Sequence, residues 1–232
     1  EEAIKLRHSV RRYLPKPLTT DQEKALQKKI NDLNQQHHLQ IQLIINEEEA
    51  FNCLMASYGK FHGVKNYIAI VAKKEKNMEE RSGRAAAELV LYSQTLGLNT
   101  CIVGKTYKKT KEIIINSNET LVMLISLGYG ENQGVSHPMK PISKIAPNYD
   151  SSPDWFKKGI DSVLLAPTAL NLMNAVFMIN EDGKVIAKSK IGVCRKENLG
   201  IMKYFLNSVL KKRLHHKVLR YACIQKQLNL FK

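Results

Sequence analysis

A long amphipathic helix, predicted between two apolar strands, constrains the fold more than any other stretch of this chain. Within residues 79–96, apolar and small side chains recur at helical spacing from Ala86 to Leu96, and Gly97 follows as a C-cap. A buried strand is expected before this helix, at 67–71, and a short strand after it, at 100–103. Such a helix must lie against a sheet, so the chain is expected to form a layered α+β or α/β domain.

The rest of the chain continues this mixture without a tandem repeat, and a polar connector is expected at 128–152. A capping box, Thr20 to Glu23, predicts the start of the second helix, and Ser152 with Pro153 predicts the start of a later one. The expected helices are 3–8, 20–36, 47–55, one from 153 and one from 197. The further strands are 39–45, 120–127 and a hairpin of 175–179 and 185–188 around the turn 180–183.

Composition is that of an ordinary globular protein. The 232 residues are 44% hydrophobic and 25% charged, which suits one domain or one domain with an appendage. No apolar run approaches the roughly 20 residues that span a bilayer, and no signal peptide is visible. The four cysteines are scattered without a C-x-x-C pair, a pattern typical of reduced thiols. A cytoplasmic protein is expected.

The net charge of +15 is concentrated at one end. Residues 184–232 hold thirteen Lys or Arg against one acid, whereas residues 1–183 are nearly balanced at +3. A basic amphipathic helix is predicted at 206–232, after a main domain of 1–205. Its apolar stripe could pack on the body or on a partner subunit, or its cations could dock on anionic membrane or nucleic acid. The stripe consists of Leu206, Leu210, Leu214, Val218 and Ala222.

A basic segment, residues 7–13, is the best candidate for a ligand site. Arg7, Ser9 and Arg11 alternate, so in extended chain all three point to one side. Two guanidinium groups and a hydroxyl on one side suit a phosphate or an electron-rich ring edge. The alternative interpretation is a solvated basic surface turn.

Five segments in register resemble one family. They run in order through most of the chain, from about Ile4 to about Phe205, and no single segment is conclusive. Together they resemble the FMN-dependent nitroreductase superfamily, and specifically its putative-nitroreductase branch typified by a Thermotoga protein. The segments are 6–13 (LRHSVRRY), 58–67 (YGKFHGVKNY), 97–104 (GLNTCIVG), 155–159 (WFKKG) and 166–171 (APTALN).

The resemblance implies a fold and a cofactor. The family's fold is α+β, a mainly antiparallel central sheet flanked by helices, usually in a dimer with FMN between the subunits. By resemblance, Arg7, His8 and Ser9 would hold the FMN phosphate, and Arg11 would lie at the pyrimidine edge of the ring. A cation at that edge favours the reduced, anionic flavin. Val103 and Gly104 belong to a turn whose backbone N–H groups would face the hydride-carrying nitrogen.

The last of the five segments lies in an unusual place. Pro167, Thr168 and Asn171 match the superfamily's A-P-S-x-x-N, which ordinarily comes early in the sequence and contacts FMN from the other subunit. Its late position here suggests a single chain that imitates the two-subunit site; alternatively, the stretch is a helix-to-strand corner. Leu172 and Met173 replace the usual Gln-Pro or Gln-Gln, which predicts a more apolar surrounding for the ring.

Other chemistries find little support. The sequence has no G-x-G-x-x-G after a strand, no G-K-[ST] loop and no nucleophile elbow. The pairs His37-His38 and His215-His216 have no partners at ligand spacing, so no metal site is expected. Cys101 lies beside the expected flavin turn, but buried cysteines are usually packing residues.

Two functional hypotheses follow. In the first, the chain is a flavoenzyme in which FMN takes hydride from NAD(P)H and reduces a nitroaromatic or quinone in ping-pong turnover, without a protein acid or base. In the second, it is a non-catalytic binding protein whose basic C-terminal helix docks on an anionic membrane, nucleic acid or protein partner. Both leave open whether the protein is a monomer or a homodimer.

Overall fold

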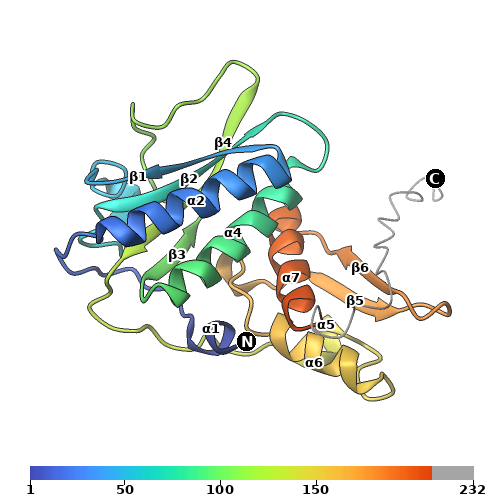
Figure 1. The fold of residues 1–232 in the computed structure, drawn as a ribbon. Helices are drawn as coiled ribbons and strands as arrows, with labels where there is room; N and C mark the ends of the chain where they lie inside the picture. Colours follow the sequence, from blue (N-terminus) through green and yellow to red (C-terminus); the bar gives the residue numbers. More distant parts are fainter. Residues whose placement is uncertain (211–232) are drawn as a thin grey trace.

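The computed structural model describes residues 1–210 and centres on a four-stranded sheet (Figure 1). The strands are β1 (Leu39–Ile44), β2 (Asn66–Lys73), β3 (Asn99–Val103) and β4 (Glu119–Gly128), in the order β1-β2-β4-β3. Every neighbouring pair is antiparallel. The sheet confirms the expected α+β class and the four strands predicted for it.

Two long helices cover one face of the sheet. Figure 1 shows α2 (Thr20–His37) and α4 (Met78–Thr95) lying across the strands. Both present an apolar stripe to the sheet, which explains why the pattern at 79–96 predicted a helix so well. The core between them is formed by Leu26, Ile30 and Leu33 of α2, Ala85, Ala86 and Leu89 of α4, and Ile68, Ile70 and Ile125 of the sheet.

The opposite face is covered by loops, a short helix and the N-terminal segment. The helix predicted at 47–55 is wrong, because residues 47–53 form turns and the helix α3 is Leu54–Tyr58. Glu47 holds the turns: its carboxylate accepts the backbone N–H of Glu49 at 2.6 Å and the hydroxyl of Tyr67. Tyr67 is fully buried, so these bonds satisfy polar groups that water does not reach.

A second layer packs on the far side of α4. It contains α5 (Ile142–Ile145), α6 (Asp154–Val163), α7 (Arg195–Leu210) and a hairpin of β5 (Ala175–Ile179) and β6 (Val185–Ser189). The pairing of β5 with β6 confirms the predicted hairpin. These elements surround a core that includes Phe156, Phe177 and Phe205.

Helices α4 and α7 approach each other at two glycines. A Cβ on Gly83 would lie 2.0 Å from the carbonyl oxygen of Glu197, and one on Gly200 would lie 2.0 Å from that of Glu80. No side chain fits at either distance. The glycines therefore allow the backbones of α4 and α7 to come into direct contact.

Helix ends differ from the predictions by a residue or more. The capping box opening α2 is formed by Thr19 and Gln22, one residue earlier than predicted, because Thr19 keeps an extended backbone while Thr20 is already helical. Pro153, not Ser152, is the N-cap of α6. Helix α1 (Glu2–Leu6) ends before Arg7, which is extended.

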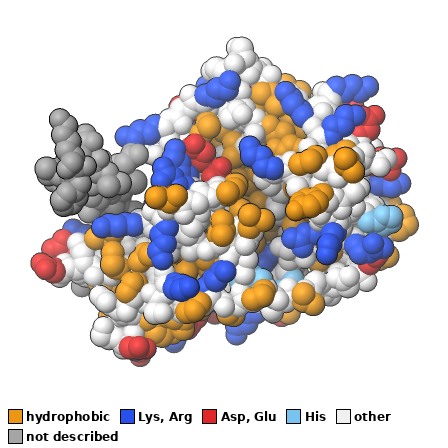
Figure 2. Space-filling model, turned by 180° about the vertical axis from the view of Figure 1, so that it is seen from behind, with side chains coloured by type: hydrophobic (Ala, Val, Ile, Leu, Met, Phe, Trp, Pro, Cys, Tyr) orange, Lys and Arg blue, Asp and Glu red, His pale blue; other side chains and the backbone are white. Residues whose placement is uncertain are grey.

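The C-terminal prediction is only partly within the described residues. Helix α7 runs past 205 to Leu210, and its Leu206 and Leu210 are buried, as expected if the apolar stripe packs on the body. The other stripe residues and His215-His216 lie outside the described residues, and the domain boundary after 205 stays a prediction. On the face shown in Figure 2, Lys and Arg side chains are spread out, with hydrophobic side chains exposed between them. Within residues 1–210, no helix has the length and apolar character needed to cross a membrane.

Candidate functional site

The basic segment is extended and lies beside strand β3. Ser9 bridges Thr100 in parallel, and the backbone N–H of Val10 donates to the carbonyl of Thr100 at 3.0 Å. The side chains of Val10 and Tyr13 are buried in the core below. The segment is therefore anchored through the buried Arg7, Val10 and Tyr13, whereas Arg11 and Arg12 are exposed.

The three side chains of the predicted alternation differ in exposure: Arg7 is buried, Ser9 is half-buried and Arg11 is exposed. Arg11, Ser9 and Arg7 all lower the pKa of the Cys101 thiol. Burial raises the pKa of Cys101 more than these three groups lower it, so the thiol stays protonated at neutral pH.

A cleft of about 100 Å³ brings together sequence segments that lie far apart. Five of the nine predicted site residues line it: Ser9, Arg11, Gly104, Pro167 and Thr168. The cleft thus joins the N-terminal segment, the end of β3 and the late Pro-Thr segment within one chain. This is the arrangement expected if a single chain imitates a two-subunit site.

Four predicted residues do not line the cleft. Val103 is buried in the core behind β3, while its neighbour Ile102 faces the cleft. Arg7 is buried beside Cys101, and His8 lies next to Arg7. Asn171 turns away and donates from Nδ2 to the carbonyl of Pro138 at 2.8 Å.

The apolar surrounding predicted from the Leu172-Met173 replacement is not found at the cleft. Met173 is buried in the core of the second layer, and Leu172 is 39% exposed; neither lines the cleft. Leu170, Asn171 and Met173 all have positive φ angles, which are uncommon for residues other than glycine.

Arg7 is a buried cation without a counter-charge. Its Nε has no hydrogen-bond partner, and among residues 1–210 no carboxylate forms an ion pair with it. Burial lowers the pKa of Arg7 to about 10, so the group is still charged at neutral pH. A buried, unpaired charge is costly, so the folded protein bears the desolvation cost of Arg7.

Sequence reasoning missed the contribution of α7. Its first turns supply Glu197, Asn198 and Ile201 to the cleft, and Cys194 precedes them. Asn198 is 1% exposed and holds the Pro-Thr segment: its Oδ1 accepts the backbone N–H of Ala169 at 2.9 Å. No motif marked this residue, because an asparagine in an amphipathic helix has no signature of its own.

Asn198→Ala is expected to loosen the Pro-Thr segment. The change also removes the bond from Asn198 Nδ2 to Asn174 Oδ1 at 2.9 Å, so it leaves a buried donor and a buried acceptor unpaired. Each unpaired group costs about 1–3 kcal/mol, and urea unfolding should show a loss of at least about 2 kcal/mol. Asn207→Ala, on the same helix but not in the cleft lining, is the control.

Acid should destabilise the ligand-free protein through His8. Its pKa is lowered by burial and by the nearby charges of Arg7 and His137. The unfolded chain, with a pKa of about 6.5, therefore binds the proton more readily, and stability falls as the pH drops below about 6.5. Thermal unfolding between pH 7.5 and 5.5 should show this loss, and His8→Gln should reduce it. An equal loss in the variant would assign it to other groups, such as His37, whose pKa burial also lowers.

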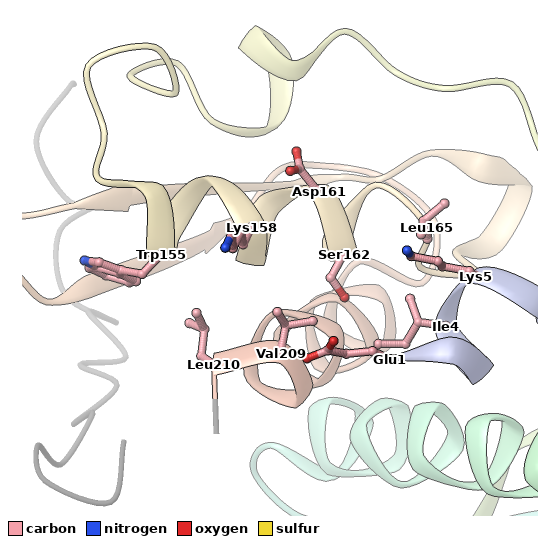
Figure 3. A pocket seen from close by; sticks show the side chains of 10 residues that line it. All are labelled: Glu1, Ile4, Lys5, Trp155, Lys158, Asp161, Ser162, Leu165, Val209 and Leu210. Carbon is pink, nitrogen blue, oxygen red and sulfur yellow. The ribbon is translucent and has the colours of Figure 1, made fainter. Parts of the chain in front are cut away.

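A larger cavity, of about 520 Å³, lies between α1, α6 and α7. Figure 3 shows that it is lined by apolar side chains such as Ile4, Trp155 and Val209, with Lys5 and Lys158 among them. Leu210, the last described residue, stands at its edge, and none of the predicted site residues reaches it. In the part of the chain that the structure covers, no group of His, Cys, Asp and Glu is arranged to hold a metal ion.

Comparison with known proteins identifies the family. The fold is similar to the crystal structure of a "putative nitroreductase" from Thermotoga maritima, with a TM-score of 0.66 and 20% identity over 91% of this chain and 83% of that one. It is also similar to a "putative nitroreductase in complex with FMN" from Desulfovibrio desulfuricans, with a TM-score of 0.50 and 17% identity over 61% of this chain and 91% of that one. No curated protein matches the sequence significantly. The family model described as "Putative TM nitroreductase" matches residues 1–208, and the chain therefore belongs to this nitroreductase family.

Proposed function

We propose that this protein is an FMN-dependent oxidoreductase that passes hydride from NAD(P)H to an electron-poor acceptor such as a nitroaromatic or a quinone. The observation that carries the proposal is the cleft, in which Ser9 and Arg11 meet Gly104 and Pro167-Thr168, with Arg7 buried nearby. Membership of the nitroreductase family and the fold shared with an FMN complex support it.

The residues present fit FMN. The unpaired Nε of Arg7 and the hydroxyl of Ser9 would hold the phosphate, and Arg11 would lie at the pyrimidine edge of the ring. The backbone at Ile102 and Gly104 would approach the ring from the β3 side. Ligand sites usually enclose about 300–1,000 Å³, so a cleft of about 100 Å³ would enclose only part of the cofactor. The remaining face would stay accessible to substrates.

Bound FMN would supply the redox chemistry, accepting hydride from the nicotinamide and delivering electrons to the acceptor. The protein's part would be to position the flavin and to tune its redox potential. The Arg11 guanidinium would stabilise negative charge on the ring edge. Exposed apolar side chains next to the cleft-lining Ala169 and Cys194 offer a surface for an aromatic acceptor: Leu170, Ile191 and Val193 are 80%, 94% and 55% exposed.

The proposal is tested by anaerobic spectroscopy of the protein reconstituted with FMN. The flavin absorption should bleach when NADPH or NADH is added and should return when menadione or a nitroaromatic follows. Arg11→Gln should slow the bleaching, because the ring edge loses its cation, whereas Arg12→Gln should not. Arg12 belongs to the same segment but points to the surface, where it pairs with Glu131 at 2.6 Å. A reconstituted protein that neither nucleotide bleaches is not this enzyme.

The alternative function, a binding protein that docks through a basic C-terminal helix, depends on residues 211–232. These lie outside the described residues, and no observation on residues 1–210 favours it. It stays a prediction, which salt-dependent retention on heparin by the full chain, lost on deletion of 203–232, would support.

A further inference from the structure

The cavity of about 520 Å³ between α1, α6 and α7 is separate from the cleft, with which it shares no lining residue. Packing between α6 and α7 fixes its walls. The hydroxyl of Ser162 donates to the carbonyl of Phe205 at 2.9 Å, and a Cβ on Gly159 would lie 2.7 Å from Cδ1 of Leu206. The cavity is therefore preformed, and its volume lies within the range of about 300–1,000 Å³ that is typical of ligand sites.

Apolar side chains from all three helices line this cavity (Figure 3). Ile4 comes from α1 and Trp155 from α6, while Leu165 follows α6. Val209 and Leu210 come from the last turn of α7. Apart from the indole these side chains are aliphatic, so the cavity suits a hydrocarbon chain, which gains free energy when it leaves water.

Two lysines supply the uncommitted charges of the lining. Lys5 and Lys158 form no salt bridge within residues 1–210. The Asp161 carboxylate accepts the hydroxyl of Tyr149 at 2.8 Å, and Figure 3 shows it pointing away from the space between α6 and α7. Glu1, the other acid of the lining, is not free either. An apolar space bordered by ammonium groups favours a ligand with a hydrocarbon body and an anionic head.

We propose that this cavity is a second ligand site, which binds a free medium-chain fatty acid. The alkyl chain lies against Ile4, Val209 and Leu210, and the carboxylate faces Lys5 and Lys158. This site is independent of the proposed function, because different residues line the cavity and the cleft.

Trp155, the only tryptophan of the chain, reports directly on the cavity that it lines. Laurate, titrated into the full chain below its micelle-forming concentration, should shift the tryptophan emission to shorter wavelength and reach saturation, because the alkyl chain displaces water from the indole. Octanoate has four fewer CH₂ groups and should bind at least about 10-fold more weakly, since each buried CH₂ strengthens binding by about 4-fold. Dodecyltrimethylammonium, which has a cationic head, should also bind more weakly than laurate.

The lysines are tested by substitutions that remove one charge each. Lys5→Gln and Lys158→Gln should each weaken laurate binding by about 2- to 5-fold, the range for an ion pair that is open to solvent. Both side chains are exposed, so neither change should disturb folding. Lys157→Gln is the matched control and should bind laurate like the wild type. Lys157 is the neighbour of Lys158 on α6, but it lies over the ring of Tyr149 and does not line the cavity.

Calorimetric titration of laurate with and without saturating FMN separates the cavity from the cleft. The affinity for laurate should be the same in both titrations, and competition by FMN would place laurate in the cleft and contradict the proposal. A Trp155 emission that does not respond to laurate would contradict it too, as would equal affinities of the two lysine variants and the Lys157→Gln control. A protein that binds laurate as described but does not bind FMN would support this site and contradict the proposed function.

Discussion

Replacing Arg7 with methionine is expected to stabilise the ligand-free protein and to remove most of its affinity for FMN. The guanidinium is 4% exposed and has no counter-charge in residues 1–210, so the folded state bears its desolvation cost. Methionine keeps the length of the apolar stem without the charge. Exchanging buried charges for apolar side chains can be neutral or stabilise by about 1–4 kcal/mol, and a gain is expected here. For a chain of this size, each 1 kcal/mol raises Tm by roughly 2–4 °C.

Thermal unfolding and FMN titration of the same variant measure both effects. FMN affinity should fall by about 100-fold, because the phosphate loses a charge-assisted hydrogen bond. Arg12→Met is the matched control: its side chain is 56% exposed and pairs with Glu131 on the surface, so both properties should barely change. A less stable Arg7→Met protein would mean that Arg7 supports the fold and is not reserved for a ligand.

The second large effect is expected at the contact between α4 and α7. Gly200→Ala would place a Cβ 2.0 Å from the carbonyl oxygen of Glu80, and Gly83→Ala would place one equally close to that of Glu197. The helices must move apart, since backbone cannot give way as a flexible side chain can. Overpacking typically costs about 1–3 kcal/mol and occasionally more, and we expect the upper end. Flavin affinity should fall as well, because α7 carries Glu197, Asn198 and Ile201 into the cleft.

Gly159→Ala is the control for this prediction. It makes the same change inside helix α6, where the nearest atom to a new Cβ is Cδ1 of Leu206 at 2.7 Å, the end of a side chain that can shift. The gain in helix propensity offsets part of that cost. Urea unfolding should therefore separate the variants clearly. If Gly200→Ala costs no more than Gly159→Ala, the glycine contact does not determine how the two helices pack.

Elements with strong periodicity could be predicted from the sequence. The apolar stripe from Ala86 to Leu96 predicted a helix packed on a sheet, and the apolar runs predicted the strands of that sheet. The structure confirms these elements. The shared side of Arg7, Ser9 and Arg11 stays a prediction. The helix predicted at 47–55 is wrong because acidic residues such as Glu47 favour the start of a helix. In the structure the carboxylate of Glu47 instead accepts hydrogen bonds from the turn that follows it and from Tyr67.

The site could be predicted only where a segment carried a motif. Asn198 reaches the cleft through tertiary contacts across a helix crossing and has no local signature. Val103 shows the limit of strand patterns: one residue of register decides that Ile102 faces the cleft and Val103 the core. The functional roles of these residues stay predictions.

Titration of the flavin-free protein with FMN, with the molar mass followed by light scattering, tests the central claim most directly. A single chain that brings both halves of the site together should bind one FMN per chain with the mass of a monomer, 26.4 kDa, before and after saturation. One FMN per two chains, or binding only on dimerisation, would contradict the claim that one chain completes the site, and no binding would contradict the flavin site itself.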